Sequence, residues 1–282
     1  MKVIESPQEM QNWSRAQSRA GLRIGLVPTM GYLHEGHLSL VRKARELCDT
    51  VIVSIFVNPI QFGEGEDYDR YPRDLSRDLD LLRKEGVDAV FTPTVRSMYP
   101  GKEQTMVEPP PGMENKLCGR NRPGHFRGVT TVVSKLFNIC LPDMAFFGQK
   151  DAQQALIIEK MVKDLNFPVR IVKGEIIREP DGLAMSSRNV YLSPEDREKA
   201  TILYRSLLMA RDLINRGERE PSKVREAMLE MINQVNGAQV DYVEIYNASD
   251  LSELEEIKGQ VLLALAVRFG TTRLIDNLLV EV

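Results

Sequence analysis

The fold of this chain is decided by residues 22–38, LRIGLVPTMGYLHEGHL. The apolar run at residues 22–27 is typical of a buried parallel strand, because it is short, rich in branched residues and ended by Pro28. Apolar side chains then recur at helical spacing from Leu38, so a helix should begin near His37. A turn with two glycines separates the two elements. This layout suits phosphate binding, because the free N–H groups and the positive dipole end of a helix attract anions.

Two imidazoles flank the expected start of this helix. His34 and His37 are three residues apart, so they should fall on one side of the turn and face whatever the helix end binds. A zinc pair and two solvent-facing histidines are the alternative interpretations. The zinc interpretation has little support, because no cysteine or third histidine lies at a zinc-finger spacing.

The composition is that of an ordinary soluble protein, and its length predicts one large domain and one smaller one. The net charge is −3 and the basic residues are scattered, so we expect no nucleic-acid partner. We expect no membrane span and no signal peptide, and the 3 widely spaced cysteines suit a cytoplasmic protein with free thiols. The chain has neither a Walker A stretch nor a G-x-G-x-x-G fingerprint, so a nucleotide must be held in another way.

Strands and helices alternate along residues 1–177, which predicts a Rossmann-like parallel sheet in an α/β domain. The expected strands are residues 22–27, 50–57, 89–92, 144–147, 169–172 and 175–178. The expected helices are residues 6–20, 37–47, 74–85, 129–140 and 148–165. The segment at residues 93–127 is rich in Pro and Gly and longer than most connections, so we interpret it as a functional loop or lid.

Residues 178–282 place helices before strands, which predicts a smaller C-terminal α+β domain. The expected helices are residues 193–216 and 221–235, and the expected strands are residues 240–246, 261–269 and 278–282. Asn236-Gly237 is typical of a hairpin turn. We expect this second domain to carry the loop at residues 185–188 and to close over the site.

Polar residues follow several expected strands, at the edge where an open parallel sheet binds ligands. Asn58 and Gln61 follow the second strand, and residues 148–154 follow the strand at residues 144–147. Further along, residues 185–188, Met-Ser-Ser-Arg, offer two hydroxyls and a guanidinium that suit phosphate oxygens. A capped turn with an exposed arginine is the alternative for that stretch, and exposed polar ends of elements are the alternative for the glutamines.

These stretches together resemble a known family. His-x-Gly-His at residues 34–37 is similar to the signature of the nucleotidyltransferase superfamily, and residues 185–188 resemble its mobile Lys-Met-Ser-Lys-Ser loop. The longer strings at residues 28–37, 57–62, 147–154 and 181–189 resemble the pantothenate synthetase family, the pantoate:beta-alanine ligases. The chain departs from the family pattern at Gln149, where Glu is usual, and at Ile177, where Val is usual.

The resemblance implies an AMP-forming ligase that condenses (R)-pantoate with beta-alanine through a pantoyl adenylate and releases pyrophosphate. ATP would be a substrate, Mg²⁺ a cofactor and the enzyme a homodimer. The implied ATP site comprises Met30, Gly31, Tyr32, Leu33, His34, Glu35, Gly36, His37, Gly148, Gln149, Lys150, Asp151, Ile177, Met185, Ser186, Ser187 and Arg188. The implied pantoate and beta-alanine site comprises Gln61, Gln154 and Asn58.

The residue types agree with this chemistry. The pantoate carboxylate is ionised near neutral pH, so its attack on the α-phosphorus needs charge neutralisation more than a base. We expect His37, His34 and Lys150 to be catalytic, with Arg188 adding charge and His37 donating to the α-phosphate. No metal ligand is firm, and the candidates are Asp78 and Asp151.

Two other functions stay open. A different nucleotidyltransferase, which transfers a nucleotidyl group to a phosphorylated acceptor, should lack the paired glutamines. A nucleotide-binding regulatory protein without turnover need not keep Lys150 together with two histidines.

Overall fold

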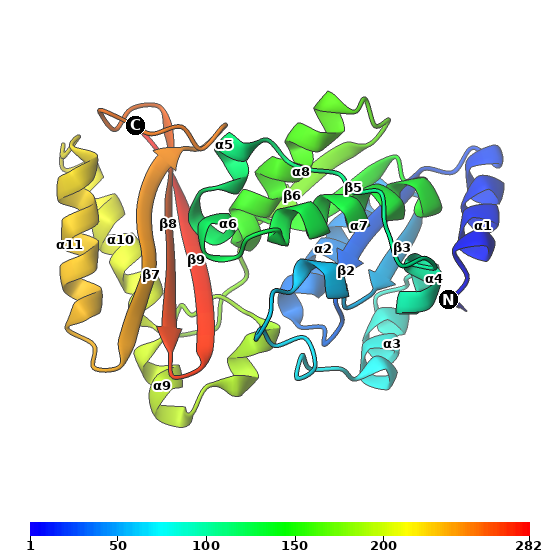
Figure 1. Cartoon of the computed structure of the whole chain (residues 1–282), viewed down its shortest axis with the longest axis horizontal. Coiled ribbons are helices and arrows are strands. Elements are labelled where there is room, and N and C mark those ends of the chain that lie inside the picture. Colours follow the sequence, from blue (N-terminus) through cyan, green and yellow to red (C-terminus); the bar gives the residue numbers. More distant parts are fainter.

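The computed structural model describes residues 1–282 and contains two β-sheets that lie along the long axis of the molecule (Figure 1). The large sheet has 6 parallel strands in the spatial order β1-β4-β3-β2-β5-β6. Its strands are β1 (Lys2–Ile4), β2 (Ile24–Thr29), β3 (Thr50–Ile55), β4 (Ala89–Phe91), β5 (Met144–Gly148) and β6 (Arg170–Gly174). The Rossmann-like sheet expected from the sequence is confirmed, and β1 is an additional edge strand that the sequence pattern did not reveal.

The strand order reverses between β2 and β5. From β2 the chain proceeds to β3 and β4 on one side, and from β5 it proceeds to β6 on the other. Open sheets bind ligands beyond the carboxyl ends of the strands at such a reversal. The fold therefore brings together the segments that follow β2 and β5.

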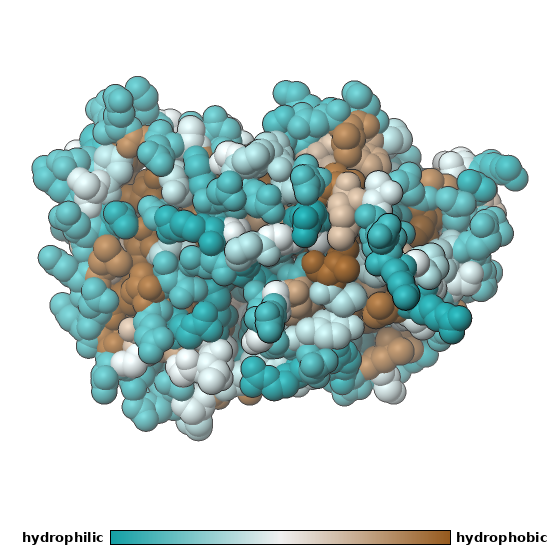
Figure 2. Space-filling model, in the orientation of Figure 1, coloured by the Kyte–Doolittle hydropathy of each residue, from teal (hydrophilic) through white to brown (hydrophobic).

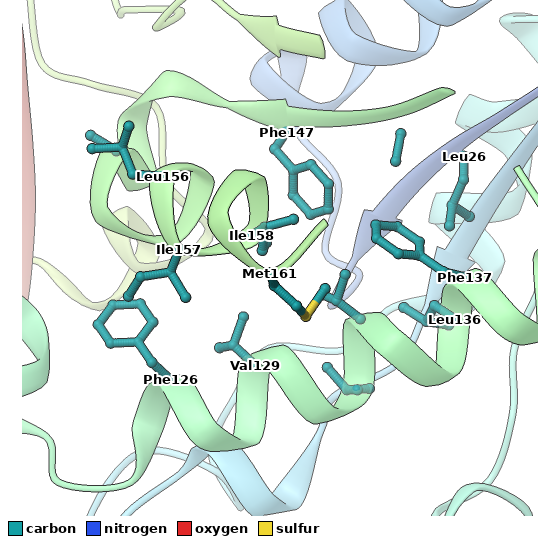
Figure 3. Close-up of a cluster of buried hydrophobic side chains, with 14 of the residues drawn as sticks. Leu26, Phe126, Val129, Leu136, Phe137, Phe147, Leu156, Ile157, Ile158 and Met161 are labelled. Carbon is teal, nitrogen blue, oxygen red and sulfur yellow. The ribbon is translucent and has the colours of Figure 1, made fainter. Parts of the chain in front are cut away.

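Helices cover both faces of the large sheet. One face carries α2 (Glu35–Leu47) and α3 (Leu75–Lys84), and the other carries α1 (Pro7–Arg19), α7 (His125–Cys140) and α8 (Ala152–Asp164). Neighbouring residues of β2 enter opposite cores, since Leu26 packs on the α7 side and Val27 on the α2 side. Burial on both faces explains why β2 reads as a continuous apolar run. Figure 3 shows the α7 side, where Leu136 and Phe137 lie near Leu26.

The second sheet is antiparallel, in the order β7-β8-β9. Its strands are β7 (Ala238–Asn247), β8 (Gln260–Phe269) and β9 (Thr272–Glu281), and its helices are α9 (Pro194–Lys199), α10 (Ile202–Asn215) and α11 (Pro221–Asn233). β8 is buried on both faces: Leu263 and Leu265 pack with α10 and α11, while Leu262 and Ala264 join the core of the first domain. The expected smaller α+β domain is thus present and shares an apolar core with the large one. We keep the proposed division at residues 177 and 178.

Several expectations about single elements are wrong. Residues 175–178 form no strand, and only Arg178 makes an isolated bridge, with Ala184. The expected helix at residues 193–216 is broken between α9 and α10, where the Thr201 hydroxyl donates to the Glu198 carbonyl and so competes with the helix pattern. Asn236-Gly237 joins α11 to β7 and is not a hairpin turn between strands.

Two further differences concern longer stretches. The segment at residues 93–127 is not wholly a loop, because it contains α4 (Val95–Met98), α5 (Pro111–Glu114) and α6 (Leu117–Asn121), and α7 already begins at His125. β9 begins at Thr272 and not at Leu278, because the polar pair Asp276 and Asn277 hides the strand pattern. Short 3-10 turns are η1 (Pro59–Gln61), η2 (Gln149–Asp151) and η3 (Ser187–Tyr191).

Figure 2 shows that the viewed face is mainly hydrophilic, with hydrophobic side chains gathered near its middle and toward the C-terminal sheet on the left. None of the helices combines the length and the apolar character needed to cross a bilayer.

Candidate active site

A cavity lies beyond the carboxyl ends of β2 and β5, at the reversal of the strand order. Five separate stretches of the chain contribute site residues that were expected from the sequence. Those that line the cavity are Met30, His34, Gly36, His37, Asn58, Gln61, Gly148, Lys150, Asp151, Gln154, Ile177, Met185, Ser186, Ser187 and Arg188. The fold therefore assembles most of the expected site in one place.

The two histidines lie together at the start of α2. Their ring centroids are 4.0 Å apart. The Nδ1 atom of His34, the N-cap residue, accepts from the N–H of Gly36 at 3.2 Å, and Nδ1 of His37 accepts from the N–H of His34 at 3.3 Å. Because each Nδ1 is an acceptor, this network assigns the ring proton to Nε2 in both residues. Each imidazole therefore keeps an Nε2–H donor for a ligand.

Burial and nearby charge favour the neutral form of both imidazoles. Burial, followed by the charge of Lys150, lowers the pKa of His34 to about 4. Burial, followed by His34 and Lys150, lowers the pKa of His37 well below its usual value. The lowered pKa values favour neutral imidazoles that offer hydrogen bonds, with positive charge supplied by Lys150 and Arg188. The expected part of the histidines in charge neutralisation stays a prediction.

The loop between β2 and α2 is held by Asp78 of α3. The Asp78 carboxylate accepts from the N–H of Tyr32 at 2.7 Å and from the N–H of Leu33 at 2.8 Å, and the residue is 1% exposed. Gly31 has φ +83°, and a Cβ there would lie 3.0 Å from the Ile55 side chain. Asp78 thus shapes the loop, and it is not among the residues that line the cavity. Its expected part in metal binding stays a prediction that these hydrogen bonds do not favour.

Five residues of the implied ATP site lie outside the cavity lining: Gly31, Tyr32, Leu33, Glu35 and Gln149. Leu33 is buried in the core on the α2 side. Glu35 faces outward and pairs with Arg42 at 2.6 Å. Gln149 turns toward the C-terminal sheet, where its Nε2 donates to Asn277 at 3.1 Å. These positions follow from helical and turn geometry, which directs neighbouring side chains to different sides.

The two cations of the cavity stand on different elements. Lys150 lies on η2, and its Nζ is 3.9 Å from the Asp151 carboxylate. Arg188 lies on η3, and its Nε and Nη2 atoms each lie 2.8 Å from the Asp67 carboxylate. The Ser187 hydroxyl donates to the Tyr32 carbonyl at 3.2 Å, so the Met-Ser-Ser-Arg stretch is docked against the loop after β2. Sequence reasoning missed Asp67, because a polar loop gives no signal of which carboxylate meets the arginine.

Asn58 acts mainly on Gln61. Its Nδ2 donates to Oε1 of Gln61 at 3.0 Å and to the Gly128 carbonyl at 3.2 Å, while its Oδ1 accepts from the Tyr99 hydroxyl at 2.8 Å. These bonds use the amide of Asn58 within the protein and orient the Gln61 side chain. Asn58 also lines the cavity, and its expected contact with substrate stays a prediction. Nε2 of Gln61 donates to the sulfur of Met30 at 3.5 Å.

An apolar wall stands beside the glutamines. It is formed by α7 residues Val129, Val132, Val133 and Leu136, together with Phe56. The sequence identified the α7 residues only as the buried side of a helix, because apolar periodicity does not separate a core face from a ligand wall.

His125, the first residue of α7, contacts Gln61 and Arg122. Its Nδ1 lies 2.8 Å from the Gln61 carbonyl oxygen and its Nε2 lies 3.0 Å from Arg122. Burial, followed by the charge of Arg122, lowers the pKa of His125 to about 4.

Known proteins resemble the chain over its whole length. A family model described as pantoate-beta-alanine ligase matches residues 2–279. A pantothenate synthetase from Syntrophomonas wolfei subsp. wolfei is 62% identical over 282 residues, which is 100% of each chain. One from Acetivibrio thermocellus is 57% identical with the same coverage.

Solved structures agree. The pantothenate synthetase from Thermus thermophilus matches with a TM-score of 0.92 and 46% identity, over 99% of each chain. The pantoate-beta-alanine ligase from Francisella tularensis, complexed with beta-gamma ATP and beta-alanine, matches with a TM-score of 0.82 and 34% identity, over 99% of this chain and 97% of that one.

Proposed function

This chain belongs to the pantoate-beta-alanine ligase family, and from that membership we propose how its cavity joins (R)-pantoate to beta-alanine at the expense of ATP. The proposal rests mainly on one observation: a single cavity contains both a surface that suits phosphates and a surface that suits a hydroxy acid. Neutral histidines and two cations, which suit phosphates, lie beside glutamines and an apolar wall, which suit a hydroxy acid. The first surface binds ATP and the second binds pantoate.

In the first step, a carboxylate oxygen of pantoate attacks the α-phosphorus of ATP. The new P–O bond forms as the bond to the bridging oxygen breaks, and pyrophosphate leaves with that electron pair. The Nε2–H groups of His34 and His37 donate to the α-phosphate, and Lys150 and Arg188 neutralise the developing charge. No base is required, because the nucleophile is already ionised.

Pantoate is placed by shape and by hydrogen bonding. Its two hydroxyls and its carboxylate meet the amides of Gln61 and Gln154, which donate and accept without adding charge. Its two methyl groups pack on the α7 wall, where burial of apolar surface is favourable. On the other side of the phosphates, Ile177 and Met185 offer apolar contacts to the adenine.

In the second step, the neutral amine of beta-alanine attacks the carbonyl carbon of the adenylate. The C–N bond forms, one proton passes from the amine nitrogen to water, the acyl C–O bond breaks with its electron pair on the phosphate oxygen, and AMP leaves. The Nε2–H groups of His34 and His37 stabilise the AMP leaving group, because the α-phosphate of ATP becomes the phosphate of AMP and stays beside them in both steps.

Magnesium fits this site as an ion held mainly by phosphate oxygens and water. The structure has no group of three or more His, Cys, Asp and Glu side chains placed to hold a metal. Mg²⁺ commonly uses one or two carboxylates with substrate phosphates, and Asp151 and Glu175 are the carboxylates that line the cavity. Asp151 neighbours Lys150, the residue proposed to meet the phosphates, so Asp151 would be its protein ligand. The family resemblance also supports a cytoplasmic homodimer, which light scattering of the purified protein tests as twice the chain mass.

Product analysis tests the reaction class. With ATP, pantoate, beta-alanine and Mg²⁺, AMP and pantothenate should appear in equal amounts. Formation of ADP would indicate attack at the γ-phosphorus and refute the proposal. A stable nucleotidyl product with a phosphorylated acceptor would favour the alternative transferase.

A further inference from the structure

Asn277 of β9 connects the C-terminal sheet to the turn that carries Lys150. The residue is 3% exposed. Its Nδ2 donates to the carbonyl oxygens of Gln149 at 3.0 Å and Lys150 at 2.9 Å, and its Oδ1 accepts from Nε2 of Gln149 at 3.1 Å. Both donors of the amide and its oxygen are therefore engaged by the short helix η2.

This arrangement matters because η2 has no side-chain cap of its own. Gly148 is its N-cap residue and makes no side-chain hydrogen bond to the turn. The backbone that carries Lys150 is instead held by a side chain from the other domain. A shift of η2 would move the ammonium group relative to the histidines of α2.

Asn277 is itself fixed by its neighbour on β9. The backbone N–H of Asn277 donates to Oδ1 of Asp276 at 2.8 Å. The Asp276 carboxylate in turn receives two bonds from Arg178, at 2.6 and 3.0 Å, and the Arg178 guanidinium stacks 3.7 Å from the centre of the Tyr204 ring. The backbone of Asn277 is thus fixed by Asp276 and Arg178, while its side chain contacts η2.

Burial of the polar side chains of Asp276 and Asn277 costs free energy, which indicates that these residues have a specific role. Two neighbouring polar side chains are buried in the middle of a strand, where apolar residues would pack without any need for partners. Every polar atom of the Asn277 amide is satisfied by η2, so the pair serves the contact between β9 and that turn.

We propose that Asn277 is a positioning residue for catalysis, which holds η2 so that Lys150 meets the phosphates of ATP. Asn277 does not line the ATP and pantoate cavity, so it acts through Lys150. The inference rests on the role of Lys150 given under the proposed function.

A double-mutant cycle tests this inference. Pyrophosphate exchange into ATP is measured with pantoate and Mg²⁺ for the wild type, Asn277→Ala, Lys150→Ala and the double variant. Asn277→Ala should lower the exchange rate about 10- to 100-fold, which is the scale for misplacing a catalytic group by about 1 Å. In the Lys150→Ala background the same change should cost less than about twofold, because the group that Asn277 positions is gone.

Asn247→Ala is the matched control. Asn247 lies on β7 of the same sheet, and its Oδ1 accepts from the backbone N–H and the hydroxyl of Ser249, within its own turn. This variant should lose comparable hydrogen bonding and change exchange by less than about twofold in either background.

Three results would overturn the inference. One is wild-type exchange by Asn277→Ala, and another is an equal loss from Asn277→Ala in both backgrounds. The third is wild-type exchange by Lys150→Ala, which would refute the proposed role of Lys150 as well and so distinguishes the two failures. If Asn277→Ala does not fold, as judged by thermal unfolding, Asn277→Ser and Gln149→Ala replace it in the same cycle with the same expected non-additivity.

Discussion

Arg188 and Asp67 form a two-point ion pair, with Nε and Nη2 of the arginine each 2.8 Å from a carboxylate oxygen. The pair joins the Met-Ser-Ser-Arg stretch to the polar loop after η1. A triphosphate that binds Arg188 must compete with the Asp67 carboxylate, because both are bidentate partners for the same guanidinium. Arg188 therefore lies at the cavity, but its guanidinium is paired with a carboxylate of the protein.

Replacing Asp67 should strengthen nucleotide binding. Asp67→Asn removes the competing charge, and we expect the Kd for ATP to fall about two- to fivefold, as for the loss of a partly exposed ion pair. Calorimetry with ATP measures this, and Asp69→Asn in the same loop is the control because Asp69 is exposed and does not pair with Arg188. Weaker ATP binding by Asp67→Asn would show that Asp67 orients Arg188 and does not compete for it.

Loss of the Nε2–H donors should slow adenylate formation. His37→Ala is expected to lower the single-turnover rate of the first step by about two to three orders of magnitude, with a smaller change in ATP affinity, since a preorganised hydrogen bond is lost mainly in the transition state. Rapid-quench measurement of pantoyl adenylate provides the rate. A near-wild-type rate would remove His37 from the catalytic group.

The histidines should make the protein less stable in mild acid. Burial lowers the pKa of His34 and of His125 to about 4, while an unfolded histidine titrates near about 6.5. Between these values the unfolded state binds more protons than the folded one, so stability rises with pH and is lost as pH falls from about 6.5 to about 4.

Urea unfolding at several pH values and NMR of the imidazole resonances measure this effect together. His34→Gln should flatten the dependence in part, because it removes one of the contributing groups. Imidazole resonances that titrate near about 6.5 in the folded protein would contradict the assignment of neutral histidines.

The glutamines should control the use of pantoate. Gln61→Ala or Gln154→Ala leaves polar groups of pantoate without partners in the cavity, so we expect a raised KM for pantoate and little change in ATP binding. Asn58→Ala should act in the same direction, because Asn58 holds the Gln61 amide at 3.0 Å. Calorimetry with ATP alone separates the effects, and a loss confined to ATP binding would place the glutamines in the other part of the cavity.

The alternation of strands and helices predicted most of the large sheet, because the apolar runs of β2, β3 and β5 are long and uninterrupted. The same patterns located the strand ends to within about two residues, and hence led to His34, His37, Gln61, Lys150 and Gln154 around one cavity. Strand ends in a parallel sheet meet at one edge, so spacing along the chain is enough to bring these groups together.

Other features depend on contacts between residues far apart in the chain. Asp67 was missed because its partner Arg188 lies 121 residues away. Asp78 was expected near a metal, yet the fold turns its carboxylate toward the N–H groups of Tyr32 and Leu33. The predicted start of β9 is too late in the chain, because the polar residue Asn277 interrupts the apolar pattern of the strand. Asn277 forms its hydrogen bonds with η2, and the local sequence pattern does not reveal such a distant partner.

Isotope exchange tests the central claim most directly, namely that this cavity activates pantoate at the α-phosphorus of ATP. Labelled pyrophosphate should exchange into ATP when pantoate and Mg²⁺ are present and beta-alanine is absent, and the exchange should disappear without pantoate. Exchange that requires beta-alanine or a phosphorylated acceptor, or that proceeds without pantoate, would contradict the account.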